Sequence, residues 1–199
     1  DFHQIVADMA NIPRKQAKTI NLGLSYGMGK EKLIKELGID DTEAESLFQQ
    51  YHANVPFIRA LQDQCARVAM DRGYIKTFAG RRCRFDLWES RYERTLPLPL
   101  EEAKEKYGDN LKRSYTYKAL NRLIQGSAAD MTKLAMLGLW EEGIVPHLQV
   151  HDEVDISIEN TEQANTVARI MENCVELAVP LLVDMELGTS WGETKDIKR

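Results

Sequence analysis

The chain has 199 residues with a formal net charge of -5, and 43% of its residues are hydrophobic. That length and composition fit a globular protein with one or two packed units, and no apolar run approaches the roughly 18 residues of a membrane-spanning helix. The three cysteines are widely spaced without a C-x-x-C pair, which argues against a zinc site or a disulfide framework. The chain starts with neither a signal-peptide pattern nor an initiator Met, so we expect it to begin inside a longer cytoplasmic protein.

Four helices are predicted in the first part of the chain. The first has a start signal at residues 11–13, where Asn11 serves as the cap before an early Pro. It should run to about Tyr26 and end at Gly27 or Gly29. Three more helices are expected over residues 30–37, 41–53 and 55–73.

Beyond the fourth helix the hydrophobic pattern changes from the helical repeat to the alternation of strands. Residues 74–85 predict a β-hairpin that turns at Gly80, and the polar segment 87–109 is interpreted as a loop with a short helical piece. A long helix is expected over residues 111–142, with a candidate break near Gly126. The remaining elements are two short strands around a tight turn at 147–158, an amphipathic helix at 161–178 and a last strand at 185–191. The predicted fold class is therefore α+β, mostly helical with a small antiparallel sheet.

Two stretches carry a local excess of positive charge despite the acidic balance of the whole chain. Residues 9–30 contain four basic residues and no acidic one, and residues 66–84 contain six basic residues and one acidic one. Such stretches are usually solvated surfaces. A partner responds to the local field rather than to net charge, so both stretches fit phosphate-facing surfaces equally well.

One face of the first predicted helix, which should run from about residue 13 to Tyr26, has the residue types of a phosphate-binding surface. Four residues recur there at four-residue intervals: Arg14, Lys18, Leu22 and Tyr26. They form one slowly drifting stripe. The two cations lie in the N-terminal half, where the helix dipole is already positive, and an anion such as a triphosphate would compensate them. The Tyr ring could stack on a base, although an ordinary surface helix with stray basic residues explains the same spacing.

Two further segments hold candidate functional side chains. His151-Asp152-Glu153 falls at a predicted turn, where adjacent carboxylates would project from the end of the sheet and suit a hard cation such as Mg²⁺. Asp is also a common turn residue without any ligand. In the long helix, Asn121 and Gln125 share a face and could contact a nucleic-acid groove or simply pack and cap.

Five segments, taken in chain order, resemble the motifs of family A (polymerase I-like) DNA polymerases. They are D-F-H at 1–3, R-x-x-x-K-x-x-x-L-x-x-x-Y-G at 14–27, G-Y-x-x-T-x-x-G-R-R at 73–82, N-x-x-x-Q-G-S-A-A-D at 121–130 and Q-V-H-D-E at 149–153. Each motif alone is a weak to moderate signal. Five of them in the order of the family, at compatible spacing, are a strong one that covers essentially the whole chain.

The resemblance implies a partial polymerase right-hand fold. Residues 1–72 would be the helices of the fingers, and residues 73–199 the connection from fingers to palm and the C-terminal part of the palm with its small sheet. The implied reaction is template-directed DNA synthesis, in which a primer 3′-OH attacks the α-phosphate of a dNTP between two Mg²⁺ ions. The implied location is cytoplasmic, in a bacterial or viral replication machinery, with no membrane partner.

The family's nucleotide-binding residues carry over onto matching positions. The resemblance implies that His3, Arg14 and Lys18 bind the phosphates of the incoming dNTP. Lys18 would also donate a proton to the pyrophosphate leaving group, which makes it a catalytic residue. Leu22 would face the sugar, and Tyr26 would lie near the templating base.

The family's metal and DNA contacts carry over in the same way. The resemblance implies that Asp152 is a catalytic Mg²⁺ ligand and that Glu153 assists it nearby. It also implies three contacts to the primer–template: Asn121, Gln125 and His151.

Three departures from the family pattern matter. Leu22 occupies a position that is usually Phe or Tyr, and Tyr117 occupies one where many members have Arg. The first palm motif, D-Y-S-x-x-E, whose Asp bridges both metals, occurs nowhere in the 199 residues. The two-metal Mg²⁺ site is therefore expected to be incomplete here and the chain inactive alone. Its expected partners are the remainder of the polymerase (first palm motif and thumb), primer–template DNA and dNTPs.

Two alternatives remain open from the sequence. A single-subunit RNA polymerase shares the Arg/Lys/Tyr-Gly helix, but that group usually lacks the Glu after His-Asp, so Glu153 and the Gln125-Gly126 motif favour a DNA polymerase. The other alternative is a non-catalytic remnant that binds nucleic acid or a partner chain. The absent first palm motif favours it, whereas the intact Lys18, Tyr26 and Asp152 disfavour it.

Overall fold

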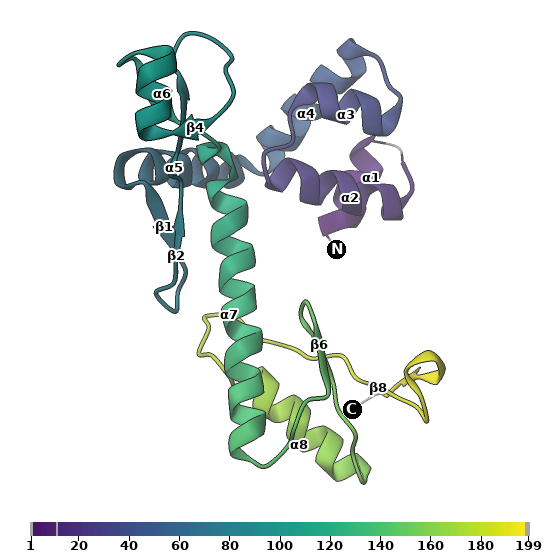
Figure 1. The fold of residues 1–199 in the computed structure, drawn as a ribbon. Coiled ribbons are helices and arrows are strands. Elements are labelled where there is room, and N and C mark those ends of the chain that lie inside the picture. The colour runs from purple at the N-terminus through teal and green to yellow at the C-terminus, as the bar shows by residue number, and fades with distance from the viewer. Residues whose placement is uncertain (1, 11, 198–199) are drawn as a thin grey trace. The chain divides into compact units, whose positions relative to one another are not determined.

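The computed structural model describes residues 2–10 and 12–197 as two compact units, Asp1–Ile124 and Gln125–Arg199 (Figure 1). Helices dominate and the sheets are small and antiparallel, so the expected α+β class is confirmed. No helix in the described part is both long and apolar enough to cross a membrane. The assignment of residues 1–72 and 73–199 to fingers and palm stays a prediction.

The first four helices share one hydrophobic core. They are α1 (Phe2–Ala10), α2 (Arg14–Ser25), α3 (Lys30–Leu37) and α4 (Asp41–Asn54). The largest fully buried side chains of this core are Val6, Ile20, Leu24, Leu33 and Tyr51. The sequence predicts α2, α3 and α4, which are confirmed, but not α1. The expected cap, Asn11, lies outside the described residues, and Pro13 occupies the N-cap position of α2.

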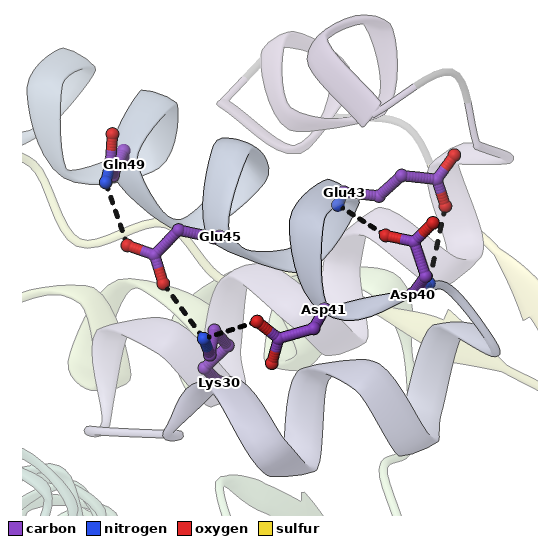
Figure 2. A network of polar contacts seen from close by, with 6 residues as sticks. All are labelled: Lys30, Asp40, Asp41, Glu43, Glu45 and Gln49. Carbon is purple, nitrogen blue, oxygen red and sulfur yellow. Dashed lines mark hydrogen bonds and ion pairs between the residues drawn. The ribbon is translucent and has the colours of Figure 1, made fainter.

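A polar network joins α3 to the start of α4 (Figure 2). Asp40 precedes α4, and its Oδ1 accepts from the backbone N–H of Glu43 at 2.9 Å, while the Glu43 side chain reaches back to the backbone N–H of Asp40. This reciprocal capping satisfies two N–H groups that a helix cannot bond internally. Lys30 Nζ lies 3.0 Å from Asp41 and 3.1 Å from Glu45, and these two hydrogen bonds raise the pKa of Lys30. The ion pairs are exposed and contribute little, so the cap is the stronger of the two devices.

α5 (Pro56–Arg72) leads into the first hairpin, as predicted. Gly73 closes the helix with a left-handed φ of 74°, and β1 (Tyr74–Lys76) pairs with β2 (Arg82–Arg84) in an antiparallel register. The buried members of this second core are Cys65, Ala69, Ile75, Phe85, Ala119 and Leu120. The hairpin is therefore packed on α5 through one face and leaves the other face to solvent.

The segment 87–109, predicted as a loop with a short helical piece, folds differently together with the next four residues. They form β3 (Leu87–Ser90), β4 (Leu98–Pro99), α6 (Leu100–Tyr107) and β5 (Leu111–Arg113). The strands make an antiparallel sheet in the order β4-β3-β5, so only the short helical piece is as expected. The loop prediction is wrong because strands of two to four residues, in a segment rich in charged side chains, are too short to show a detectable alternation.

Arg113, the last residue of β5, links this sheet to α5 and to the first hairpin. Its guanidinium donates from Nε to the carbonyl of Met70 at 3.1 Å and from Nη1 to the carbonyl of Phe85 at 2.9 Å. The same group lies over the Trp88 ring, 4.3 Å from its centroid. A Cβ atom at Gly73 would lie only 2.7 Å from Arg113 Cζ. One side chain therefore holds three segments together through two hydrogen bonds and a cation–π contact.

α7 (Ala119–Glu141) is the longest helix of the described chain, and it begins later than predicted. The expected helix starts at residue 111, but residues 111–113 belong to β5 and a 3-10 turn (Thr116–Lys118) precedes α7. Tyr115 has a left-handed φ of 60°, which interrupts any right-handed helix. The candidate break near Gly126 does not occur, because α7 continues through it.

The second unit combines the C-terminal part of α7 with α8 (Thr161–Glu172) and two hairpins. The strand pairs are β6 (Leu148–Val150) with β7 (Glu153–Asp155), as predicted, and β8 (Glu186–Leu187) with β9 (Lys195–Asp196) around a 3-10 turn at Trp191–Glu193. Ile170 of α8 packs against Gly138 of α7. α8 ends at Glu172, before the expected residue 178, and the expected last strand at 185–191 is half of a hairpin.

Gly73→Ala should destabilise the chain more than Gly38→Ala does. Both glycines have left-handed φ values, 74° and 66°, so each substitution costs about 1 kcal/mol of backbone strain. A Cβ at Gly38 meets nothing within 4 Å, whereas at Gly73 it displaces the guanidinium of Arg113. Loss of the hydrogen bonds of that group should bring the total for Gly73→Ala to roughly 2–4 kcal/mol in urea denaturation. Equal losses in the two variants would show that Arg113 does not hold the sheet in place.

Candidate nucleotide-binding and metal-binding sites

α2 buries one face and exposes the other. The buried face consists of Ala17, Ile20, Asn21 and Leu24. The stripe predicted from the sequence lies on the opposite side, where Arg14, Lys18 and Leu22 are exposed and Tyr26 is half-buried. No acidic residue in the first turn offsets the positive end of the helix dipole. The helix therefore presents two cations and then an apolar and an aromatic side chain along one exposed face.

Helix α5 fixes the C-terminal end of α2. Gln62 donates from Nε2 to the carbonyl of Leu24 at 3.0 Å and to the carbonyl of Ser25 at 2.9 Å. The last carbonyls of a helix have no partner within it, so this amide supplies one from a neighbouring element. Tyr26 follows directly, and its place at the end of the stripe is held by that anchor.

His3 contacts α2 from α1. Its Nδ1 lies 2.8 Å from Nδ2 of Asn21, which is 3% exposed. Asn21 Oδ1 in turn accepts from the hydroxyl of Tyr51 at 2.9 Å. His3 is predicted from the sequence, whereas Asn21 and Tyr51 are not. A polar residue on the apolar face of an amphipathic helix is the signal that would have found Asn21, because such a group is buried only when it is hydrogen-bonded.

An open pocket of about 670 Å³ lies beside the C-terminal end of α2. Its wall brings together three predicted residues: Leu22 from α2, Tyr26 directly after α2, and Asn121 from α7. The wall also contains side chains that the sequence analysis does not single out: Met28, Lys32, Lys118 and Arg122. Two tyrosine rings and three cations in one wall suit a flat, anionic ligand such as a nucleotide.

Tyr117 is the second aromatic residue of this pocket. The residue is 59% exposed, and Nζ of Lys118 lies 5.6 Å from the centroid of its ring and 4.6 Å from the centroid of the Tyr115 ring. The position where the motif usually has Arg therefore combines a ring face with an adjacent positive charge. Stacking on a base is chemically open to such a pair, although a bidentate contact to a phosphate is not.

The β6–β7 hairpin carries the second candidate site. His151 has a left-handed φ of 58°, which lets the chain reverse between the two strands. Asp152 follows it in the turn, and both are exposed, as is Glu153 at the start of β7. Asp155 lies at the other end of β7, opposite Leu148. The structure thus confirms the predicted turn at His151 and Asp152, and it places Asp155 further along the second strand.

The carboxylates of this turn can supply part of a coordination shell. Asp152 and Glu153 are adjacent, exposed and rich in the hard oxygen donors that Mg²⁺ prefers. Within residues 2–10 and 12–197, no group of three or more His, Cys, Asp or Glu side chains is arranged to hold a metal ion. The residue types of the turn are ones that a hard cation such as Mg²⁺ accepts as ligands.

Asn121 and Gln125 lie one turn apart on α7, as the sequence predicts. Asn121 is half-buried in the wall of the pocket, and Gln125 is exposed.

Comparison with known proteins decides between the families that share these motifs. The sequence profile of DNA polymerase family A matches residues 2–193. The chain belongs to DNA polymerase family A. Its fold is similar to that of the POL domain of Pol1 from M. smegmatis, solved in complex with DNA primer–template and dNTP. The TM-score is 0.68 at 28% identity, over 91% of this chain and 32% of that one. The expected partial polymerase fold is confirmed.

Two relatives of this family A chain are DNA polymerases. The DNA-directed DNA polymerase of Pseudomonas phage M6 is 37% identical over 98% of this chain, and the thermostable DNA polymerase I of Thermus aquaticus is 36% identical over 92%. The chain covers 31% and 21% of the lengths of these two proteins, respectively. Both relatives are DNA polymerases, so the alternative family of single-subunit RNA polymerases is set aside.

Proposed function

We propose that this family A chain binds the incoming dNTP and supplies one metal-binding carboxylate in a polymerase that extends a primer on a DNA template. The observation that carries the proposal is the exposed stripe on α2, in which two cations lead to a pocket with two tyrosine rings. A triphosphate needs cations and a base needs a flat face, so one nucleotide matches the whole stripe. Relatives from a phage and from bacteria support a place in viral or bacterial DNA replication.

Arg14 and Lys18 bind the triphosphate, and His3 assists them. The planar guanidinium of Arg14 can hold two phosphate oxygens at once, whereas Lys18 offers a compact charge and a transferable proton. Lys18 is therefore the residue suited to protonate the pyrophosphate leaving group. Leu22 is one turn further along the stripe and faces the sugar, and Tyr26 lies beside the templating base.

Asp152 binds Mg²⁺, and Glu153 assists it from the next position. Mg²⁺ bound there would stabilise the charge that develops on the phosphates and favour ionisation of the primer 3′-OH. A two-metal site needs a further carboxylate, which we assign to the remainder of the polymerase, because D-Y-S-x-x-E does not occur in the 199 residues. The chain spans a third or less of the phage and Thermus relatives, which leaves room for that motif and for a thumb.

The proposed contacts to primer–template DNA come from Asn121, Gln125 and His151. Their side chains can both donate and accept hydrogen bonds, as recognition of base and sugar edges requires. The β1–β2 hairpin adds positive charge for the DNA backbone. Lys76 stands directly opposite Arg82 across the strands, and Arg84 is exposed as well. Like charges in register are unfavourable, and phosphates on that surface would offset the repulsion.

Lys18→Ala should slow nucleotide incorporation, and Arg14→Ala should mainly raise the KM for dNTP. In the complete polymerase, each change removes a charge-assisted hydrogen bond of about 1.5–3 kcal/mol, which corresponds to roughly 10- to 150-fold. Lys15→Ala is the matched control, since Lys15 is an exposed cation on the same helix but outside the stripe. Single-nucleotide incorporation kinetics measure all three variants. Wild-type kinetics for Lys18→Ala and Arg14→Ala would refute the assignment of the triphosphate to α2.

Asp152→Ala should abolish synthesis by the complete polymerase, whereas Asp155→Ala should keep most of it. Loss of a metal ligand removes several kcal/mol of transition-state stabilisation, at least about a thousandfold in rate. Asp155 lies at the other end of β7 and is too far along the strand to share that role. Primer extension gives the rate, and DNA binding by Asp152→Ala should remain near that of the wild type. An inactive Asp155→Ala alongside an active Asp152→Ala would reverse the assignment.

Leu22→Tyr should raise the use of dideoxynucleotides, and Leu22→Phe should not. Leu22 is 42% exposed in the pocket wall, so a larger side chain there would meet the sugar rather than the core. A tyrosine hydroxyl can replace a hydrogen bond lost with the 3′-OH, which should improve dideoxynucleotide incorporation by roughly tenfold. Phe adds the ring without the hydroxyl and is the matched control. Equal selectivity between dNTP and ddNTP in the wild type and both variants would mean that Leu22 does not face the sugar.

A further inference from the structure

Four side chains form a continuous line of hydrogen bonds that runs from Ser25 to His3. Ser25 Oγ lies 2.9 Å from the hydroxyl of Tyr51, that hydroxyl lies 2.9 Å from Asn21 Oδ1, and Asn21 Nδ2 lies 2.8 Å from His3 Nδ1. The two central residues are 1% and 3% exposed. Water cannot replace their partners, so these hydrogen bonds must be made within the protein.

For the orientation that the Asn21 amide has in the structure, the direction of each hydrogen bond in this line follows from its donors and acceptors. Asn21 Oδ1 can only accept, so Tyr51 uses its single hydroxyl proton on that atom. The Ser25 hydroxyl must then be the donor to the oxygen of Tyr51. At the other end, Asn21 Nδ2 can only donate, and His3 Nδ1 must therefore accept. All of the donors point toward His3, so each bond polarises the next in the same sense.

We propose that Asn21, oriented by Tyr51, is a positioning residue that sets the tautomer of His3. A neutral imidazole whose Nδ1 accepts a hydrogen bond carries its proton on Nε2. His3 then offers an N–H donor from Nε2 to an oxygen of the triphosphate of the incoming nucleotide. This inference rests on the proposed binding of dNTP by His3. It adds that Asn21 selects Nε2 as the ring nitrogen of His3 that carries the proton.

The position of Asn21 favours this role over simple core packing. Its neighbours on the buried face of α2 are Ala17, Ile20 and Leu24. A leucine there would avoid the cost of removing an amide from water, which is about 1–3 kcal/mol when the amide is unpaired. The buried amide therefore stands where an apolar residue would suit the core, and its donor group faces a ring atom of a proposed ligand-binding residue.

The tautomer can be read directly by ¹⁵N NMR of histidine-labelled complete polymerase at pH 8, with His3→Gln to assign the signal. We expect the Nε2–H form in the wild type and a shift to the Nδ1–H form in Asn21→Asp, because a carboxylate can only accept. Ser25→Ala is the matched control: it removes the far end of the line and should leave the tautomer unchanged. A wild-type signal of the Nδ1–H form, or an unchanged tautomer in Asn21→Asp, would overturn the proposal.

Tyr51→Phe provides a second variant that keeps the ring and removes only the hydroxyl. Without that donor the Asn21 amide can turn over, so we expect a mixture of the two His3 tautomers. A pure Nε2–H signal in this variant would show that Tyr51 does not orient the amide. This substitution introduces no charge into the core, so the test does not depend on the folding of Asn21→Asp.

Kinetics of single-nucleotide incorporation on a matched primer–template separate this inference from the proposed function. Asn21→Asp and His3→Ala should each raise the KM for dNTP by about tenfold with little change in kcat. The double variant should be no worse than His3→Ala alone, because Asn21 acts through His3. Additive losses would overturn the positioning role and leave dNTP binding by His3 intact. An unchanged KM in His3→Ala would instead overturn the contact between His3 and the triphosphate, and the inference with it.

Discussion

The burial of one face of α2 is the constraint on which the proposed nucleotide site depends. Ile20 and Leu24 are removed from water against α1 and α4, at a gain of about 1.5–3 kcal/mol for each side chain. A helix that buries these positions must expose the residues on its other side. Arg14, Lys18 and Leu22 are therefore outward-facing as a consequence of core packing, and a ligand can reach all of them from the same side.

Two polar side chains, Gln62 and Asn21, hold the residues around the exposed face of α2 in position. Gln62 holds the last carbonyls of α2, and Asn21 connects the buried face to His3 on α1. Neither contact adds much stability, since a net hydrogen bond is worth about 1 kcal/mol. Each instead removes freedom from a residue that the proposed mechanism uses, which is how a site on rigid helices keeps its donors oriented before the ligand arrives.

The sequence predicts most helices and the two hairpins that matter for function, because each has strong local signals. Gly73 precedes the first hairpin and Gly80 lies in its turn, and the turn at His151 and Asp152 interrupts two alternating segments as expected. The sheet formed by residues 87–113 was not predictable, since Arg113 holds it through contacts to Met70 and Phe85 that are distant in sequence. The partners of His3 were missed for the same reason: Asn21 and Tyr51 meet only after α1, α2 and α4 have packed. Motif spacing predicts which side chains share a helix face, but not which buried polar groups support them.

The most direct test of the account is a crystal structure of the complete polymerase with a dideoxy-terminated primer on its template and the matching dNTP. We expect the nitrogens of Arg14 and Lys18 within about 3 Å of triphosphate oxygens and Leu22 against the sugar. A triphosphate bound away from α2, with Arg14 and Lys18 still in solvent, would contradict the central claim that the exposed face of this helix is the site of the incoming nucleotide.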